Sequence, residues 1–161
     1  MYFNKVKAFL DANSVKYVVI SHSKAYTAQG IAAVSHISGK ELAKTVIVKL
    51  DDTLAMAVLP ASFRIDMQRL KEGAGANDIG LPGEAAFRAR FPGCETGAMP
   101  PFGNLFEMPV YIDEALTKDK EIAFSAGSHN EVIRLSFEDF ARLVKPKVLK
   151  FTLAHVNVHA A

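Results

Sequence analysis

Two apolar runs joined by a short polar turn constrain the fold of this chain most. Residues 45–50 and 54–59 are rich in β-branched and aliphatic side chains, and they flank the polar residues 51–53. Short length, β-branching and a polar turn predict a β-hairpin. Because both runs are apolar at nearly every position, we expect the hairpin to be buried on both faces of a sheet. Other parts of the chain must therefore cover both sides of that sheet.

The remaining segments predict a mixture of helices and strands. Apolar residues at helical spacing, with capping side chains, predict helices over residues 4–13 (capped by Asn4), 67–71 (capped by Asp66), 84–91 and 137–144 (capped by Ser136). A further helix, capped by Thr27, is predicted to run through residues 28–33 and to end near residues 38–39. Apolar, β-branched segments predict strands over residues 16–20, 110–112, 121–124 and 132–135. Residues 148–158 are expected to form an added strand or a mobile end. Without repeats or linkers, these elements predict one compact α/β (α+β) domain over residues 1–161.

Composition places the chain among ordinary globular proteins. Its 161 residues are 50% hydrophobic and 22% charged, and the net charge of +2 is too small to indicate nucleic-acid binding by itself. The single cysteine, Cys94, excludes an internal disulfide framework and a zinc site built on several cysteines. No apolar run approaches eighteen residues and the first residues do not resemble a signal peptide. We therefore expect a soluble cytoplasmic protein that makes no membrane contact.

The sequence predicts neither a cofactor nor a metal. It contains no GxGxxG motif after a strand and no P-loop motif, so nucleotide cofactors are not indicated. His155 and His159 have a spacing that suits metal ligands on a helix, but they lie in a β-branched tail with no acidic third ligand nearby. We therefore expect the two histidines to be ordinary residues of the tail that bind no metal.

Lys44 is the first candidate site residue. It lies between the polar residues 38–41 and the first strand of the hairpin. A lysine at the mouth of a buried strand can direct one compact positive charge into a cleft. The alternative is an ordinary solvated lysine at the start of a strand.

A rigid loop and a histidine turn are the other candidates. Residues 97–104 read Gly-Ala-Met-Pro-Pro-Phe-Gly-Asn, in which the backbone N–H groups of Gly97 and Ala98 could stabilise a developing negative charge. The same residues could form only a structural turn. His129 follows Gly127 and Ser128, and is either a pocket residue or a surface histidine. Cys94, without an adjacent basic group, is expected to be an inert thiol.

Four segments taken together resemble one known family. Thr27-Ala-Gln, the lysine strand 43–48 before the hairpin, the loop 97–103 and the turn 125–129 are similar, in order and spacing, to the YbaK/prolyl-tRNA-synthetase-associated editing domain. The resemblance is strongest over residues 21–144. It implies a mixed, barrel-like β-sheet surrounded by helices. It also implies hydrolysis of the ester that links a wrong, small amino acid (alanine, serine, threonine or cysteine) to the terminal adenosine of a tRNA.

The resemblance also implies roles for individual residues. Lys44 would contact the tRNA 3′ end, and the loop that begins with Gly97 and Ala98 would orient the ester carbonyl. The residues implied to bind the substrate are Thr27, Thr45, Pro101, Phe102, Gly103, Gly127, Ser128 and His129. Thr45 stands where the alanine-clearing branch has asparagine, which weakens the case for alanine as substrate. The implied partner is the 3′ end of an aminoacyl-tRNA, with prolyl-tRNA synthetase or another synthetase as a further candidate, and the oligomeric state is left open.

Two other functions fit the same residues. The chain could be a non-catalytic module that binds aminoacyl-tRNA or a synthetase, or a hydrolase of a small ester unrelated to tRNA. A pure binding module does not require both Lys44 and an intact GxxxP loop, which begins at Gly97. The sequence therefore favours the deacylase.

Overall fold

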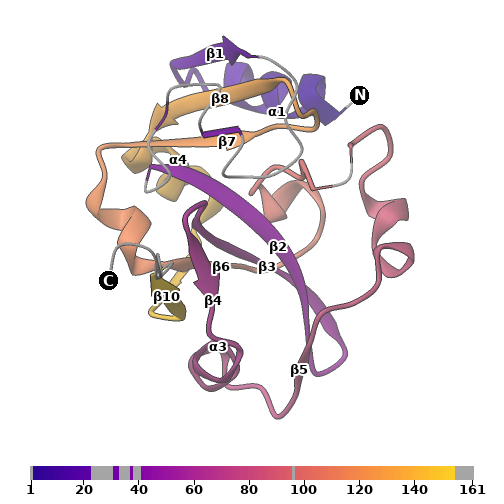
Figure 1. Cartoon of the computed structure of the whole chain (residues 1–161). Coiled ribbons are helices and arrows are strands. Elements are labelled where there is room, and N and C mark those ends of the chain that lie inside the picture. Colours follow the sequence, from indigo (N-terminus) through magenta and orange to yellow (C-terminus); the bar gives the residue numbers. More distant parts are fainter. Residues whose placement is uncertain (1, 23–30, 33–36, 38–40, 96, 155–161) are drawn as a thin grey trace.

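A computed structural model describes residues 2–22, 31–32, 37, 41–95 and 97–154 (Figure 1). Thr27, most of the helix predicted to follow it, and the tail beyond residue 154 lie outside the described residues. The helices are α1 (Tyr2–Ala12), α3 (Met67–Ala74) and α4 (Phe137–Val144), and four short 3-10 helices are η1 (Glu84–Ala86), η2 (Arg88–Arg90), η3 (Gly103–Leu105) and η4 (Glu114–Lys118). The strands are β1 (Tyr17–Ser21), β2 (Leu42–Leu50), β3 (Thr53–Pro60), β4 (Phe63–Ile65), β5 (Ile79–Gly80), β6 (Val110–Asp113), β7 (Glu121–Ser125), β8 (Glu131–Ser136), β9 (Lys147–Leu149) and β10 (Thr152–Ala154).

An eight-stranded mixed sheet organises the molecule around the predicted hairpin. Its order is β1-β8-β7-β2-β3-β6-β9, with β5 also paired to β2, and β10 pairs with β4 in a separate two-stranded sheet. Strands β2 and β3 are antiparallel from Ala43 opposite Pro60 to Leu50 opposite Thr53. Strands β2 and β7, β3 and β6, and β6 and β9 are parallel pairs. The predicted hairpin and the predicted mixed α/β architecture are both confirmed.

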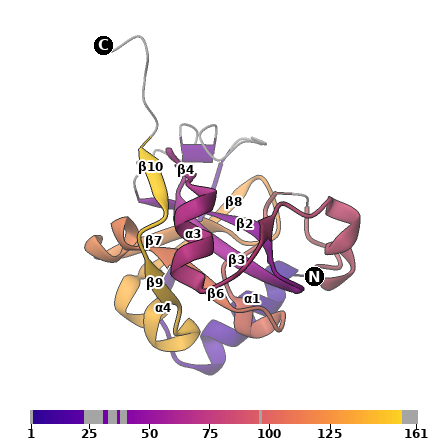
Figure 2. The ribbon, with the colours of Figure 1, turned by 90° about the horizontal axis from the view of Figure 1, so that it is seen from below.

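Alternate side chains of the hairpin enter different hydrophobic clusters. Met56 and Val58 of β3 belong to the cluster that contains residues of α1 and α4. Ala57 and Leu59 belong to another cluster, which contains Leu70 of α3. Helix α3 is the element nearest the viewer in Figure 2. Because side chains alternate between the two faces of a strand, these clusters cover opposite faces of the sheet. The expected burial of the hairpin on both faces is confirmed for β3.

Two of the predicted helix caps are confirmed, and two other helix predictions are wrong. The Asp66 side chain accepts a hydrogen bond from the Arg69 N–H, and the Ser136 side chain accepts one from the Asp139 N–H, as predicted. The helix predicted over residues 84–91 is wrong, because that segment forms the two 3-10 helices η1 and η2. Helix α1 begins at Tyr2, so Asn4 is not its N-cap. Within the described ranges, no helix is long and apolar enough to span a membrane.

Candidate active site

A pocket opens where two parallel strands separate. Strands β2 and β7 are paired only over Leu42–Ala43 and Ala123–Phe124, after which β7 ends at Ser125 while β2 continues. The side chains that line the pocket include Lys44 and Thr45 from β2 and Ser125 from β7. The other lining residues are Ile31, Leu42, Ala43, Gly97 and Met99. Ligand sites commonly lie beside the ends of parallel strands that diverge in this way.

Lys44 carries the positive charge of this pocket, and it lies between two apolar clusters. On the same face of β2, Leu42 belongs to the cluster at one end and Val46 and Val48 to the cluster at the other. The lysine is half-buried, and desolvation lowers its pKa from the usual 10.5. Its ammonium has no hydrogen-bond or ion-pair partner within the described residues. A half-buried cation in this state favours an anionic ligand.

The loop that follows Glu95 forms the opposite wall and is tied to the turn after β7. The Glu95 N–H donates to the Gly127 carbonyl at 2.9 Å, and the Gly127 N–H donates to the Ala98 carbonyl at 2.7 Å. Gly97 and Gly127 have φ angles of 83° and 104°, a left-handed region in which other residues are strained. The glycines of these two motifs therefore permit the close approach of the two loops.

One amide of the predicted oxyanion site is already occupied. The Ala98 N–H donates to the Glu95 carbonyl at 3.0 Å, and Ala98 is 0% exposed. In this conformation the Ala98 amide is therefore not available to a ligand, and its binding of the ester carbonyl stays a prediction. Gly97 is exposed at the pocket, and its N–H has no partner among the residues that the structure describes. Gly97 therefore offers a backbone donor to a ligand in this pocket.

His129 is buried behind the loop. It is 4% exposed, so the alternative of a surface histidine is wrong. Its Nε2 lies 3.8 Å from Oε2 of Glu95, and a Cβ placed on Gly97 would lie 3.6 Å from its Cε1. His129 does not itself line the pocket that contains Lys44. Its position therefore allows it to support the Gly97 loop from behind.

Three residues predicted to bind substrate instead form part of the core. Pro101, Phe102 and Gly103 are buried, and the Phe102 ring makes edge contacts with the rings of Phe124 and Phe140 at centroid distances of 5.3 and 5.5 Å. A Cβ on Gly103 would overlap the carbonyl oxygen of Met108. None of the three lines the pocket beside Lys44. In this structure the three residues pack the loop against the sheet, and their implied contact with substrate stays a prediction.

Ser128, Gly127 and Cys94, which the sequence analysis also singled out, do not line the pocket that contains Lys44. Ser128 donates from its hydroxyl to Oδ1 of Asn130 at 2.8 Å and does not line the pocket. Gly127 is buried and acts through its backbone, as described above. Burial and the neighbouring Glu95 carboxylate raise the pKa of the Cys94 thiol to about 12, in agreement with an inert cysteine. In the described part of the chain, no group of three or more possible ligands is placed to hold a metal ion.

Sequence reasoning missed Ser125 as a pocket residue. Its hydroxyl-bearing side chain lines the same pocket as Thr45. The available signal was its position at the end of a predicted strand, directly before the glycine turn. Ile31 and Met99, which also line the pocket, carry no chemical signal in the sequence beyond their apolar character.

The fold and this pocket define a class of protein that comparison with known families identifies. The family model described as "Aminoacyl-tRNA editing domain" matches residues 22–143, which is most of the chain. The chain belongs to the aminoacyl-tRNA editing domain family. The resemblance noted from the motifs is confirmed, together with the fold it implied.

Individual relatives agree with this assignment. The chain is 27% identical over 152 residues to the multifunctional Ser/Thr-tRNA deacylase ProXp-y of Escherichia coli K12, with 89% of each chain covered. The crystal structure of a proposed trans-editing enzyme for prolyl tRNA synthetase superposes with a TM-score of 0.80 at 18% identity, covering 95% of this chain and 98% of that one. The crystal structure of a hypothetical protein has the same TM-score of 0.80 at 21% identity, covering 92% of this chain and 99% of that one. These two likenesses show the fold.

Proposed function

We propose that this chain hydrolyses the ester of tRNA mischarged with serine or threonine, and that the pocket between β2 and β7 is its active site. Membership of the editing family supports hydrolysis of aminoacyl-tRNA, and the related Ser/Thr-tRNA deacylase supports a hydroxylated amino acid. The observation that carries the proposal is the pocket itself. It combines one half-buried ammonium with two hydroxyl-bearing side chains, those of Thr45 and Ser125.

Lys44 binds the anionic part of the substrate in this proposal. The terminal nucleotide of a tRNA brings a phosphate close to the ribose that carries the amino acid. An ammonium without a partner among the described residues can pair with that phosphate and thereby fix the ester in the pocket. The apolar neighbours Leu42 and Val46 reduce access of water to the ammonium, which strengthens the pairing.

The backbone of the loop stabilises the transition state. A water molecule attacks the ester carbonyl carbon, a C–O bond forms, and negative charge develops on the carbonyl oxygen. The Gly97 N–H donates to that oxygen. The bond to the ribose oxygen then breaks, and this oxygen takes up the proton that the water releases. An activated ester needs positioning and charge stabilisation more than a strong protein nucleophile. The inert Cys94 is consistent with this chemistry.

Hydroxyl groups in the pocket favour serine and threonine over alanine. The hydroxyls of Thr45 and Ser125 can each accept or donate a hydrogen bond to a substrate hydroxyl. A site built to bind a hydroxyl discriminates strongly against analogues that lack it, because its own polar groups are then left unpaired. Alanine is therefore expected to be a poorer substrate, and proline is expected to be excluded by the bulk of its ring.

The test is a panel of tRNAs charged with serine, threonine, alanine or proline. We expect wild-type protein to release serine and threonine fastest. Ser125→Ala should slow release of serine roughly 2- to 10-fold, the value of one hydrogen bond, and leave release of alanine unchanged. Ser21→Ala, an exposed serine at the end of β1, is the matched control. An equal effect of Ser125→Ala on the serine and alanine esters would contradict the proposed hydrogen bond between Ser125 and the substrate hydroxyl.

The same panel separates the two other functions that fit the sequence. A non-catalytic module would bind the charged tRNAs without releasing any amino acid. A hydrolase of small esters would release the amino acid from a simple alkyl ester as fast as from tRNA. Association with a synthetase is a separate proposal, which is tested by adding prolyl-tRNA synthetase to the assay and measuring whether release becomes faster.

A further inference from the structure

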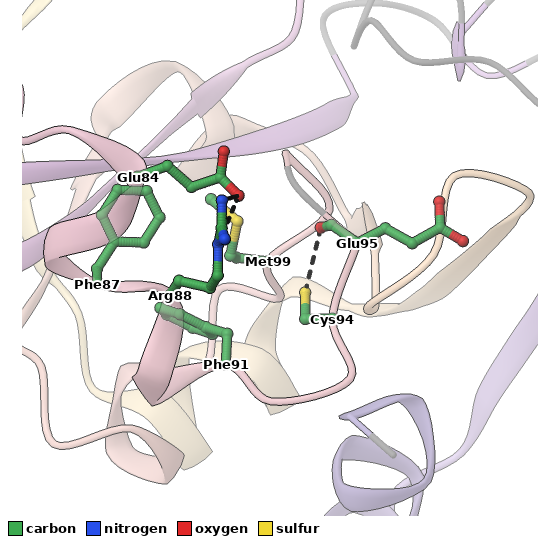
Figure 3. A pocket seen from close by; sticks show the side chains of 7 residues that line it. All are labelled: Glu84, Phe87, Arg88, Phe91, Cys94, Glu95 and Met99. Atoms are coloured by element: carbon green, nitrogen blue, oxygen red, sulfur yellow. Dashed lines mark hydrogen bonds and ion pairs between the residues drawn. The ribbon is translucent and has the colours of Figure 1, made fainter.

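A second pocket lies beside the candidate active site and has no role in the mechanism above. Figure 3 shows the side chains that line it, which are Glu84, Phe87, Arg88, Phe91, Cys94, Glu95 and Met99. Met99 lines both this pocket and the one that contains Lys44. A ligand in one pocket is therefore immediately next to a ligand in the other. We call this second site the aromatic pocket.

Two phenylalanine rings give the aromatic pocket its shape. The rings of Phe87 and Phe91 are nearly perpendicular, at 86°, with centroids 6.3 Å apart. Phe91 is 4% exposed and packs against Phe106 at a centroid distance of 4.7 Å, so it forms the floor. Phe87 is only partly buried. Phe87 therefore leaves aromatic surface open to a planar ligand.

A guanidinium group and a carboxylate lie at the rim. Nε of Arg88 donates to Oε1 of Glu84 at 3.1 Å, and a terminal nitrogen of the same group lies 3.0 Å from that oxygen. The Arg88 side chain is 71% exposed, and this pair fixes its guanidinium beside the Glu84 carboxylate at the rim (Figure 3). Aromatic rings and guanidinium planes are the surfaces on which unpaired nucleobases stack. The carboxylate of Glu84 can accept a hydrogen bond from an exocyclic amine.

The other polar groups leave the aromatic pocket free for stacking. The Glu95 side chain points away from the rings (Figure 3), toward His129 at 3.8 Å. The thiol of Cys94 donates to the Glu95 carbonyl at 3.4 Å, so it offers an uncharged sulfur to the lining. The interior is thus apolar and aromatic, with its charges at the rim.

We propose that the aromatic pocket binds an unpaired nucleobase with an exocyclic amine from the 3′ end of the substrate tRNA. This inference rests on the proposed function, which places the ester in the pocket of Lys44. The ester is attached to the terminal ribose, and that ribose also carries the terminal base. A base of this nucleotide or the one before it must therefore lie within one nucleotide of Lys44, and Met99 connects the two positions.

The experiment measures binding and hydrolysis separately. Binding is measured with an uncharged RNA oligonucleotide that has the sequence of the single-stranded tRNA 3′ end, and with two versions that lack the terminal base or the preceding base. The proteins are wild type, Phe87→Ala, Arg88→Ala and Arg69→Ala. Arg69 is an exposed arginine of α3, outside both pockets, and serves as the control. Arg88→Ala keeps the test valid if Phe87→Ala fails to fold.

We expect the wild type to bind the intact RNA about 5- to 100-fold more tightly than the version that lacks the base in the pocket. Phe87→Ala and Arg88→Ala should bind the intact RNA more weakly than the wild type does. Their affinities for the intact RNA and for the RNA that lacks the base should be similar. The altered RNA that the wild type and these two variants bind equally well identifies which base binds in the pocket. Equal binding of intact RNA by Phe87→Ala, Arg88→Ala and Arg69→Ala would overturn the proposal. It would also be overturned if Phe87→Ala and Arg88→Ala preferred the intact RNA over the RNA without the base as strongly as the wild type does.

Hydrolysis of charged tRNA by the same four proteins distinguishes this proposal from the proposed function. Base-dependent binding without any hydrolysis by the wild type would contradict the proposed function and leave the aromatic pocket as a base-binding site. Hydrolysis that is unaffected by removing either base would overturn the proposal that the aromatic pocket binds a base, and it would leave the proposed deacylase function standing.

Discussion

At the scale of single residues, chemical type was predictable and surroundings were not. Lys44 could be selected from the sequence because a charged residue interrupts the start of an apolar strand. The burial of His129 could not, because it depends on how the Glu95 loop folds over the turn after β7. Ser125 was missed for a similar reason, since its place in the pocket follows from the divergence of two strands that are far apart in the chain.

The half-buried charge of Lys44 predicts a dependence of stability on pH. Desolvation lowers its pKa below 10.5, so between the lowered pKa and 10.5 the unfolded chain binds the proton more readily than the folded one. The free energy of unfolding therefore rises with pH in that window. Lys44→Met removes the buried charge, and should raise the free energy of unfolding at pH 7 by an amount that shrinks as the pH approaches 10.5.

Urea denaturation at neutral and at alkaline pH measures this difference. Lys49→Met, a replacement of an exposed lysine on the same strand, is the control and should show no such trend. If Lys44→Met is less stable than the wild type at pH 7, the account of Lys44 as a desolvated and unpaired charge is wrong.

At the scale of elements, structure that depends on neighbours in sequence was predictable. The hairpin and the caps of α3 and α4 rest on residues within a few positions of one another. The segment between Pro82 and Pro92 was mispredicted, because its apolar spacing and flanking prolines suit a pair of 3-10 turns as well as an α-helix. Several of its N–H groups instead donate to the carbonyl three residues earlier, as Phe87 does to Glu84.

The packing of the loop predicts an asymmetry between two glycines. A Cβ on Gly103 would overlap the backbone of Met108, which flexible side chains cannot relieve. Gly83 has φ −65° and ψ 153°, and a Cβ there meets nothing within 4 Å. Gly103→Ala should therefore lower the free energy of unfolding by about 2 kcal/mol or more, and Gly83→Ala by less than about 0.5 kcal/mol. Chemical denaturation of the two variants side by side checks this, and equal costs would contradict the observed loop packing.

At the scale of the whole molecule, the fold class could be predicted because it follows from pattern and order of elements. The arrangement of the sheet could not, since the pairing of β2 with β7 joins segments about eighty residues apart, and such pairing leaves no local signal. The division of the core into clusters on opposite faces of β3 likewise appears only once the strands are assembled.

One continuous sheet predicts cooperative unfolding. Strands from the first and last parts of the chain lie in the same eight-stranded sheet, so no part can be lost without exposing the core of another. The chain has no tryptophan and four tyrosines, so the near-ultraviolet circular dichroism reports tyrosine packing. We expect this signal and the far-ultraviolet signal to change at the same temperature. Two separate transitions would indicate two independently stable units instead of a single domain.

The release of serine from mischarged tRNA by wild type and by Lys44→Ala tests the central claim most directly. The account predicts rapid release by the wild type and a loss of roughly 30-fold or more in Lys44→Ala, because the substrate anion then lacks the charged partner that the described lining of the pocket offers. Lys44→Ala should meanwhile unfold at a temperature no lower than the wild type, since the lysine is half-buried without a partner among the described residues. Undiminished release by a folded Lys44→Ala protein would contradict the claim that this pocket is the active site.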